Sequence, residues 1–155
     1  MRRWALRTVF TSALAGWMAL IFNLSSLPDE RVSLVGPQLG QYAAYDVPWF
    51  GSLRSILGHL VLFGILASFI QATIWSWTTY TKHSLRLAFG VLILAVLYGI
   101  SDELHQSFIA GRNMSASDVL VDALGAAVDV AILRQVVKAA YHTPNFSFRH
   151  TLSQA

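Results

Sequence analysis

Residues 85–100 read LRLAFGVLILAVLYGI, an apolar run that leads directly into the polar stretch SDELHQ at residues 101–106. A helix that continues through both stretches has the length of about 20 residues that crosses the hydrocarbon core of a bilayer. The apolar part contains a single charged side chain, Arg86, which lies near its beginning. We therefore expect a membrane-spanning helix whose polar end lies near one membrane face.

Three other segments have the same character. We expect helices over about residues 5–24, 53–77 and 118–137, so the predicted fold is all-α, an integral membrane bundle of four transmembrane helices. No clear small-residue cleavage site follows the first run, and we expect that helix to be uncleaved. Residues 1–140 are predicted to form one membrane domain, and residues 141–155 a mobile cytoplasmic tail. The linker of about 28 residues between the first two helices, including Val47-Pro48-Trp49-Phe50, is predicted to be a loop resting partly in the membrane interface.

The composition agrees with a membrane protein. Of 155 residues, 55% are hydrophobic and only 12% are charged, which is unusual for a soluble chain. Lys and Arg outnumber Asp and Glu by 11 to 8, but they lie beside the hydrophobic runs, where membrane topology explains them better than nucleic-acid binding does. We therefore exclude nucleic acid as a partner and expect the lipid bilayer. Since the chain has no cysteine, any bound metal would need Asp, Glu or His ligands.

The basic residues also predict the orientation. Eight of them flank helix ends on the side of the termini, against three on the opposite side. The eight are Arg2, Arg3, Arg7, Lys82, Arg86, Arg134, Lys138 and Arg149, and the three are Arg31, Arg54 and Arg112. Because Lys and Arg favour the cytoplasmic side, we expect a multi-pass protein of the cytoplasmic membrane with both termini in the cytoplasm.

The polar end of residues 85–106 contains the first candidate site residues. In a helix, Asp102, His105 and Gln106 share one face, and Glu103 projects about 100° away from Asp102. Two carboxylates and an imidazole partly shielded from water are suited to acid–base catalysis or to a divalent metal. We interpret Asp102, Glu103 and His105 as candidate catalytic residues and Gln106 as a ligand-binding residue. The alternative is a hydrogen-bonded plug that joins helices.

The fourth helix contributes a stripe of acids to the same end. Asp118, Asp122, Gly125 and Asp129 recur at spacings of four, three and four, which places them on one helix face. Asp118 and Asp122 lie near the polar end of the third helix and are candidate ligand-binding residues, whereas Asp129 lies about 16 Å beyond Asp118 and is separated from the site. Ser115 is predicted to cap the start of this helix.

Two further ligand-binding candidates come from other segments. His59 enters the second helix at a depth similar to that of Asp122 and is interpreted either as a packing residue or as part of the site. Arg112, in the link before the fourth helix, either pairs with a neighbouring carboxylate or binds an anionic group of a ligand.

The polar residues and glycines of the last two helices follow the pattern Asp102-Glu103-Leu104-His105-Gln106, Gly111-Arg112, Asp118, Asp122 and Gly125. This pattern resembles the VanZ-like family of bacterial membrane proteins. Weaker similarity covers residues 21–26 and His59 with Phe63, so the likeness extends over nearly all of residues 5–137. The chain departs from the family at Asp122, where Asn is common, and at Ile56, where a lysine is common. The resemblance implies a compact helical membrane domain and a link to teicoplanin susceptibility, but it implies no reaction.

Three kinds of function agree with these residues. The first is an acid/base or metal-assisted membrane enzyme, or a binding protein, for a lipid-linked or cell-envelope molecule at the outer leaflet. In the enzyme, Glu103 or Asp102 would be the general base, His105 its proton partner or a metal ligand, and Arg112 the anchor for an anionic head group. The second is a non-catalytic module that organises envelope machinery. The third, a small exporter, is disfavoured because only Asp129 lies at mid-depth.

Overall fold

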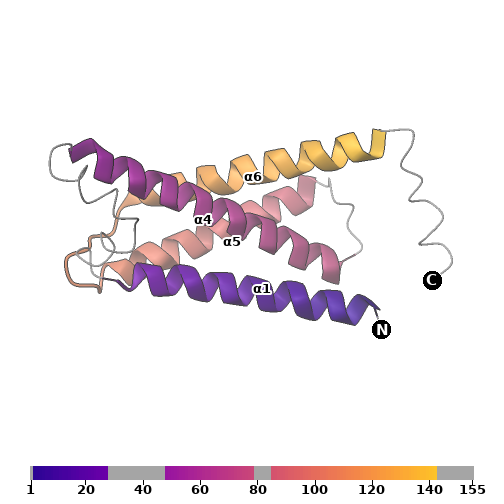
Figure 1. Ribbon diagram of the computed structural model, residues 1–155, viewed down its shortest axis with the longest axis horizontal. Coiled ribbons are helices and arrows are strands. Elements are labelled where there is room, and N and C mark those ends of the chain that lie inside the picture. The colour runs from indigo at the N-terminus through magenta and orange to yellow at the C-terminus, as the bar shows by residue number, and fades with distance from the viewer. Residues whose placement is uncertain (1, 28–47, 79–84, 143–155) are drawn as a thin grey trace.

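The computed structural model describes residues 2–27, 48–78 and 85–142, and these ranges contain helices and no strands. The helices are α1 (Arg2–Ser25), α4 (Pro48–Trp77), α5 (Leu85–Gln106) and α6 (Ala116–His142). They run alternately back and forth along an elongated bundle, so the start of α1 and the end of α6 lie at the same end (Figure 1). We call this the terminal end, and the opposite end, where α6 begins, the distal end. The predicted all-α fold is confirmed for the described residues.

Three of the helices are long and apolar enough to cross a membrane, over residues 3–25, 55–77 and 85–106. Helix α6 is of comparable length, but Asp118, Asp122, Asp129, Arg134 and Lys138 are spread along it. Its apolar character is therefore weaker, and its passage through the membrane remains a prediction.

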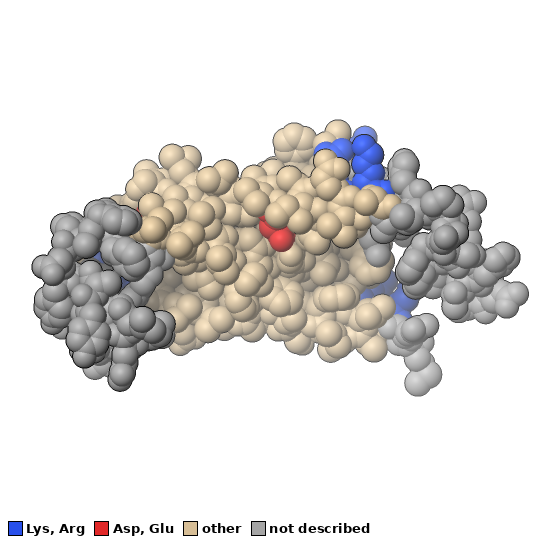
Figure 2. All heavy atoms as spheres, turned by 45° about the horizontal axis from the view of Figure 1, so that its top comes forward, with Lys and Arg blue, Asp and Glu red and all other residues tan. Residues whose placement is uncertain are grey.

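The outside of the bundle is largely apolar. Phe89, Ile93 and Leu97 of α5 and Leu120 of α6 are all more than half exposed. Figure 2 shows one such face, on which acidic atoms appear only in a small spot and the basic atoms gather toward the terminal end. An exposed apolar belt of this kind is expected of a protein that contacts lipid.

The basic side chains are distributed unevenly between the two ends. Among the described side chains, Arg3, Arg7, Arg86, Arg134 and Lys138 lie toward the terminal end, and Arg112 lies at the distal end. The described basic side chains are therefore concentrated at the end that the sequence predicted. Which end faces the cytoplasm remains a prediction.

Helix α6 packs chiefly against α4 and then α5, whereas α1 packs chiefly against α4. The closest approach is at Gly125 of α6, where an added Cβ would lie 2.9 Å from the Cα of Leu60 in α4. Only a residue without a side chain permits this crossing. The core beside it is built from Phe63, Leu66 and Ala126, together with Val91 of α5.

Two predicted boundaries need correction. Helix α4 begins at Pro48 rather than near residue 53, so residues 48–52 belong to the helix and not to the interfacial loop. Proline is well tolerated in the first turn because its missing N–H would have no intrahelical partner there. Helix α6 continues to His142 and so includes the first two residues of the predicted tail. Residues 28–47 of that loop and residues 143–155 of that tail lie outside the described residues.

Candidate functional site

The polar residues at the distal end form two groups on different sides of α5. The first group lies toward α1 and centres on Asp102, which is 4% exposed. Ser25 Oγ donates a hydrogen bond of 2.8 Å to Asp102 Oδ2, and Gln106 Nε2 donates one of 2.9 Å to the same oxygen. Asp102 therefore joins the ends of α1 and α5.

His105 belongs to this α1 side as well. Its Nε2 lies 2.9 Å from Ser26 Oγ, and its ring stacks on Phe22 with 4.2 Å between ring centroids. About two turns earlier in α5, Tyr98 donates its hydroxyl hydrogen to the carbonyl of Met18 at 2.6 Å. The face that Asp102, His105 and Gln106 were predicted to share is thus confirmed, and it is directed at α1.

The second group lies toward α4 and α6, and Glu103 is its buried acid. The backbone N–H of Ser115 donates a 2.7 Å hydrogen bond to Glu103 Oε2. The side chain is 0% exposed, and its Oε1 has no hydrogen-bond partner among the described residues. Ser115 also accepts the N–H of Asp118 on its Oγ at 3.2 Å, which confirms the predicted cap of α6. One serine therefore fixes both the start of α6 and the position of the Glu103 carboxylate.

His59 and Asp122 form a hydrogen-bonded pair next to Glu103. Their Nδ1 and Oδ1 atoms are 2.9 Å apart, and the side chains are 13% and 0% exposed. The second oxygen of Asp122 faces Gly99 of α5, where an added Cβ would lie 3.0 Å from it. Asp122 is thus held between α4 and α5, and it orients the imidazole of His59.

His59, Glu103 and Asp118 converge from three helices. Each offers one potential ligand atom, and these atoms all lie within 4.8 Å of one another. We call these residues the His–Glu–Asp group. Carboxylates and an imidazole at such distances can exchange protons or can share a cation, since both functions need acceptor atoms that face one point.

The match to a known protein family includes all of these site residues. The family model described as VanZ/LLP1 matches residues 10–138, a range that includes every candidate site residue. The chain belongs to the VanZ/LLP1 family. The resemblance found in the sequence is thereby confirmed. No curated protein and no solved structure matches the chain.

In this VanZ/LLP1 chain the predicted catalytic residues are divided between the two groups. Asp102 and His105 lie toward α1, while Glu103 faces α4 and α6. The imidazole that accompanies Glu103 is that of His59, a residue that the sequence left open between packing and binding. The roles of these residues remain predictions, but the geometry favours His59 over His105 as the partner of Glu103.

The predicted acidic stripe of α6 is confirmed, and it faces α4. Asp122 bonds to His59, Gly125 meets Leu60, and Asp129 Oδ1 accepts a 2.9 Å hydrogen bond from Ser68. Asp129 is separate from the His–Glu–Asp group, as expected.

Arg112 is half-buried and forms no ion pair with any described acid. Asp29, Glu30 and Asp46 lie outside the described residues.

Ser25 and Ser26 were not predicted as site residues, yet both bond to candidate residues of α5. Two consecutive hydroxyl groups at the end of a membrane-length apolar run were the available signal, because such groups need partners when they are buried.

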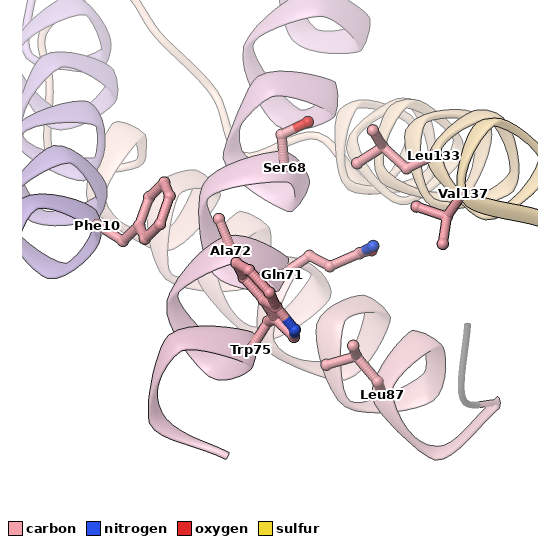
Figure 3. A pocket seen from close by; sticks show the side chains of 8 residues that line it. All are labelled: Phe10, Ser68, Gln71, Ala72, Trp75, Leu87, Leu133 and Val137. Atoms are coloured by element: carbon pink, nitrogen blue, oxygen red, sulfur yellow. The ribbon is translucent and has the colours of Figure 1, made fainter. Parts of the chain in front are cut away.

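A separate cavity of about 280 Å³ lies nearer the terminal end. It is lined from all four described helices, and Figure 3 shows Gln71 reaching from α4 into the space between Val137 of α6 and Leu87 of α5. The lining is mostly apolar and includes no charged side chain among the described residues. The proton-coupled path of an exporter would need such a group, so this cavity does not favour that alternative.

Proposed function

We propose that the distal end of this VanZ/LLP1 protein binds and acts on a lipid-linked or cell-envelope molecule at the outer leaflet, and that this activity changes susceptibility to teicoplanin-type glycopeptides. The observation that carries the proposal is the convergence of His59, Glu103 and Asp118 within 4.8 Å at one end of an apolar bundle. Ionisable groups in such surroundings are expensive, by roughly 2.5–3.5 kcal/mol each on insertion scales, so their concentration at one depth favours a function.

The neighbouring loop supports an amphiphilic ligand. Phe108 is 79% exposed and Met114 is 56% exposed, and Arg112 lies between them in the sequence. Exposed apolar side chains on both sides of a cation without a described acidic partner suit a molecule with acyl chains and an anionic head group.

In this proposal Glu103 is the acid–base residue. Its position is fixed by the Ser115 N–H, and Oε1 has no described partner; because the side chain is buried, it exchanges protons with a bound molecule through the partly exposed His59. His59 receives or supplies protons at the same point, and Asp122 holds its ring in place. Arg112 binds the anionic head group.

The test compares variants at matched membrane levels in a glycopeptide-sensitive bacterium that expresses the chain. Glu103→Gln and Arg112→Gln should each remove the change in teicoplanin susceptibility, since the first lacks the base and the second the anchor. Asp129→Asn, which alters a partly buried acid outside the site, should retain it. Full activity of both site variants would contradict the proposal.

A second function, the organisation of envelope machinery without catalysis, is favoured by the α1-side group. Asp102 Oδ2 accepts hydrogen bonds from Ser25 of α1 and from Gln106 of its own helix, and the bond from Ser25 adds to the packing of α1 on α4 in attaching α1 to the bundle. The membrane levels of the variants, measured before they are matched for the assay, separate the two functions. If Glu103→Gln lowers the amount of protein as Asp102→Asn is expected to do, Glu103 is structural and the organising role gains support.

A further inference from the structure

We propose that His59, Glu103 and Asp118 bind one divalent transition-metal ion, with Zn²⁺ the best match to the ligand set. One imidazole nitrogen and two carboxylate oxygens are typical zinc ligands, whereas Ca²⁺ and Mg²⁺ favour oxygen alone. The two carboxylates also balance the charge of a divalent ion. Three protein ligands leave a fourth tetrahedral position open, which is the arrangement of catalytic rather than structural zinc sites.

The distances allow this with little rearrangement. Ligand atoms around a tetrahedral Zn²⁺, each about 2.0–2.2 Å from the metal, lie roughly 3.4 Å from one another. The potential ligand atoms of His59, Glu103 and Asp118 already lie within 4.8 Å of one another. Rotation of the half-buried Asp118 carboxylate can shorten these distances while Asp122 holds the His59 ring.

The surroundings of the Glu103 carboxylate support a bound cation independently of the distances between the three side chains. The carboxylate is 0% exposed, one oxygen is occupied by the Ser115 N–H, and the other has no described partner. Leaving an acceptor unsatisfied in the interior is costly, and a cation bound between Glu103 and its two neighbours would remove that cost.

The imidazole ring of His59 is also oriented in a way that suits metal binding. Asp122 is bonded to Nδ1 of His59, so Nε2 is the nitrogen left to bind a metal. Metal-binding histidines commonly have their other ring nitrogen bonded to a carboxylate, which fixes the ring and its tautomer. Asp122 is therefore a positioning residue, and its place is defined by contact with Gly99.

This inference concerns the same site as the proposed function but rests only on these contacts, and with the ion bound Glu103 and His59 are its ligands rather than proton-transfer groups. The experiment uses the full chain purified in detergent without a histidine tag. The protein is treated with EDTA and dialysed against ZnCl₂, and bound zinc is measured by elemental analysis. We expect one zinc ion per chain and a higher unfolding temperature in its presence, because a ligand that binds only the folded state stabilises it.

Substitutions of the three proposed ligands test where the ion binds. His59→Asn retains an amide that can donate to Asp122 but lacks Nε2, and Glu103→Gln and Asp118→Asn remove the charged ligands. Each should weaken zinc binding at least about tenfold, and Asp122→Asn should weaken it by about 10–100-fold through loss of ring positioning. Asp129→Asn has the matched chemistry on the same helix and should bind zinc like the unaltered chain.

Absence of stoichiometric zinc in the unaltered chain would overturn the inference, as would equal binding in the ligand variants and in Asp129→Asn. Gel filtration identifies any variant that fails to fold, and the half-buried Asp118 provides a substitution that disturbs the core least. The outcomes also separate this inference from the proposed function. Zinc binding without an effect of Glu103→Gln on susceptibility would contradict the function alone, and the reverse result would contradict the metal site alone.

Discussion

At the scale of single residues, the His59–Asp122 pair shows how a buried acid depends on its partner. Asp122 is fully buried and His59 is 13% exposed on its side chain, so neither group has much access to water. A buried pair often contributes little net stability, but the removal of one partner leaves the other without compensation.

We therefore predict that His59→Leu destabilises the protein by about 3–5 kcal/mol and that the double variant His59→Leu with Asp122→Leu recovers part of this loss. The recovery is expected because the double variant no longer buries an unpaired acid. Denaturant unfolding in detergent of both single variants and the double variant gives the coupling energy. Additive effects of the two substitutions would show that the side chains do not interact.

At the scale of helices, the crossing of α4 and α6 determines where the site forms. Gly125 allows the backbones to approach so closely that a Cβ there would lie 2.9 Å from Leu60 Cα. This contact lies one residue from His59 on α4 and about one helical turn from Asp122 on α6, and it holds their two helices at the separation that their hydrogen bond requires.

Gly125→Ala should therefore lower stability by roughly 1–3 kcal/mol through overpacking and should also weaken any ligand binding at the His–Glu–Asp group. Gly90→Ala is the control, because an added Cβ there meets nothing within 4 Å. Thermal unfolding in detergent measures the stability of both variants. Similar melting temperatures for the two variants would mean that the close crossing is unimportant.

At the scale of the whole molecule, the even number of described helices places the start of α1 and the end of α6 at one end of the bundle (Figure 1). The excess of basic side chains at that end predicts that it faces the cytoplasm. The natural chain has no cysteine, so single introduced thiols can report sidedness without a background.

We predict that Ser117→Cys, an exposed position at the distal end, reacts with a membrane-impermeant maleimide in intact cells. Ala139→Cys, an exposed position near the end of α6, should react only after permeabilisation. The reverse pattern would place the site on the cytoplasmic side and exclude an outer-leaflet ligand. Equal reaction of both positions in intact cells would indicate that α6 does not cross the membrane.

The sequence predicts the helices and the acidic stripe well because long apolar runs and spacings of three and four are local signals. It also predicts that Asp102 and Glu103 point in different directions. It does not predict which helix each residue meets, because that depends on how α1, α4 and α6 are arranged around α5. For this reason the pairing of Glu103 with His59 and of His105 with Ser26 emerged only from the structure. The sequence does not predict the start of α4 at Pro48, because proline occurs both in loops and in first helical turns.

Ser115 has a consequence for how the protein can vary. Its N–H holds the Glu103 carboxylate and its hydroxyl holds the first turn of α6, so the loop over residues 107–114 is anchored to both. An insertion or deletion in that loop would move the helix register and the acid together, and neither change could be absorbed alone. Divergence in this loop should therefore change side chains while its length stays constant.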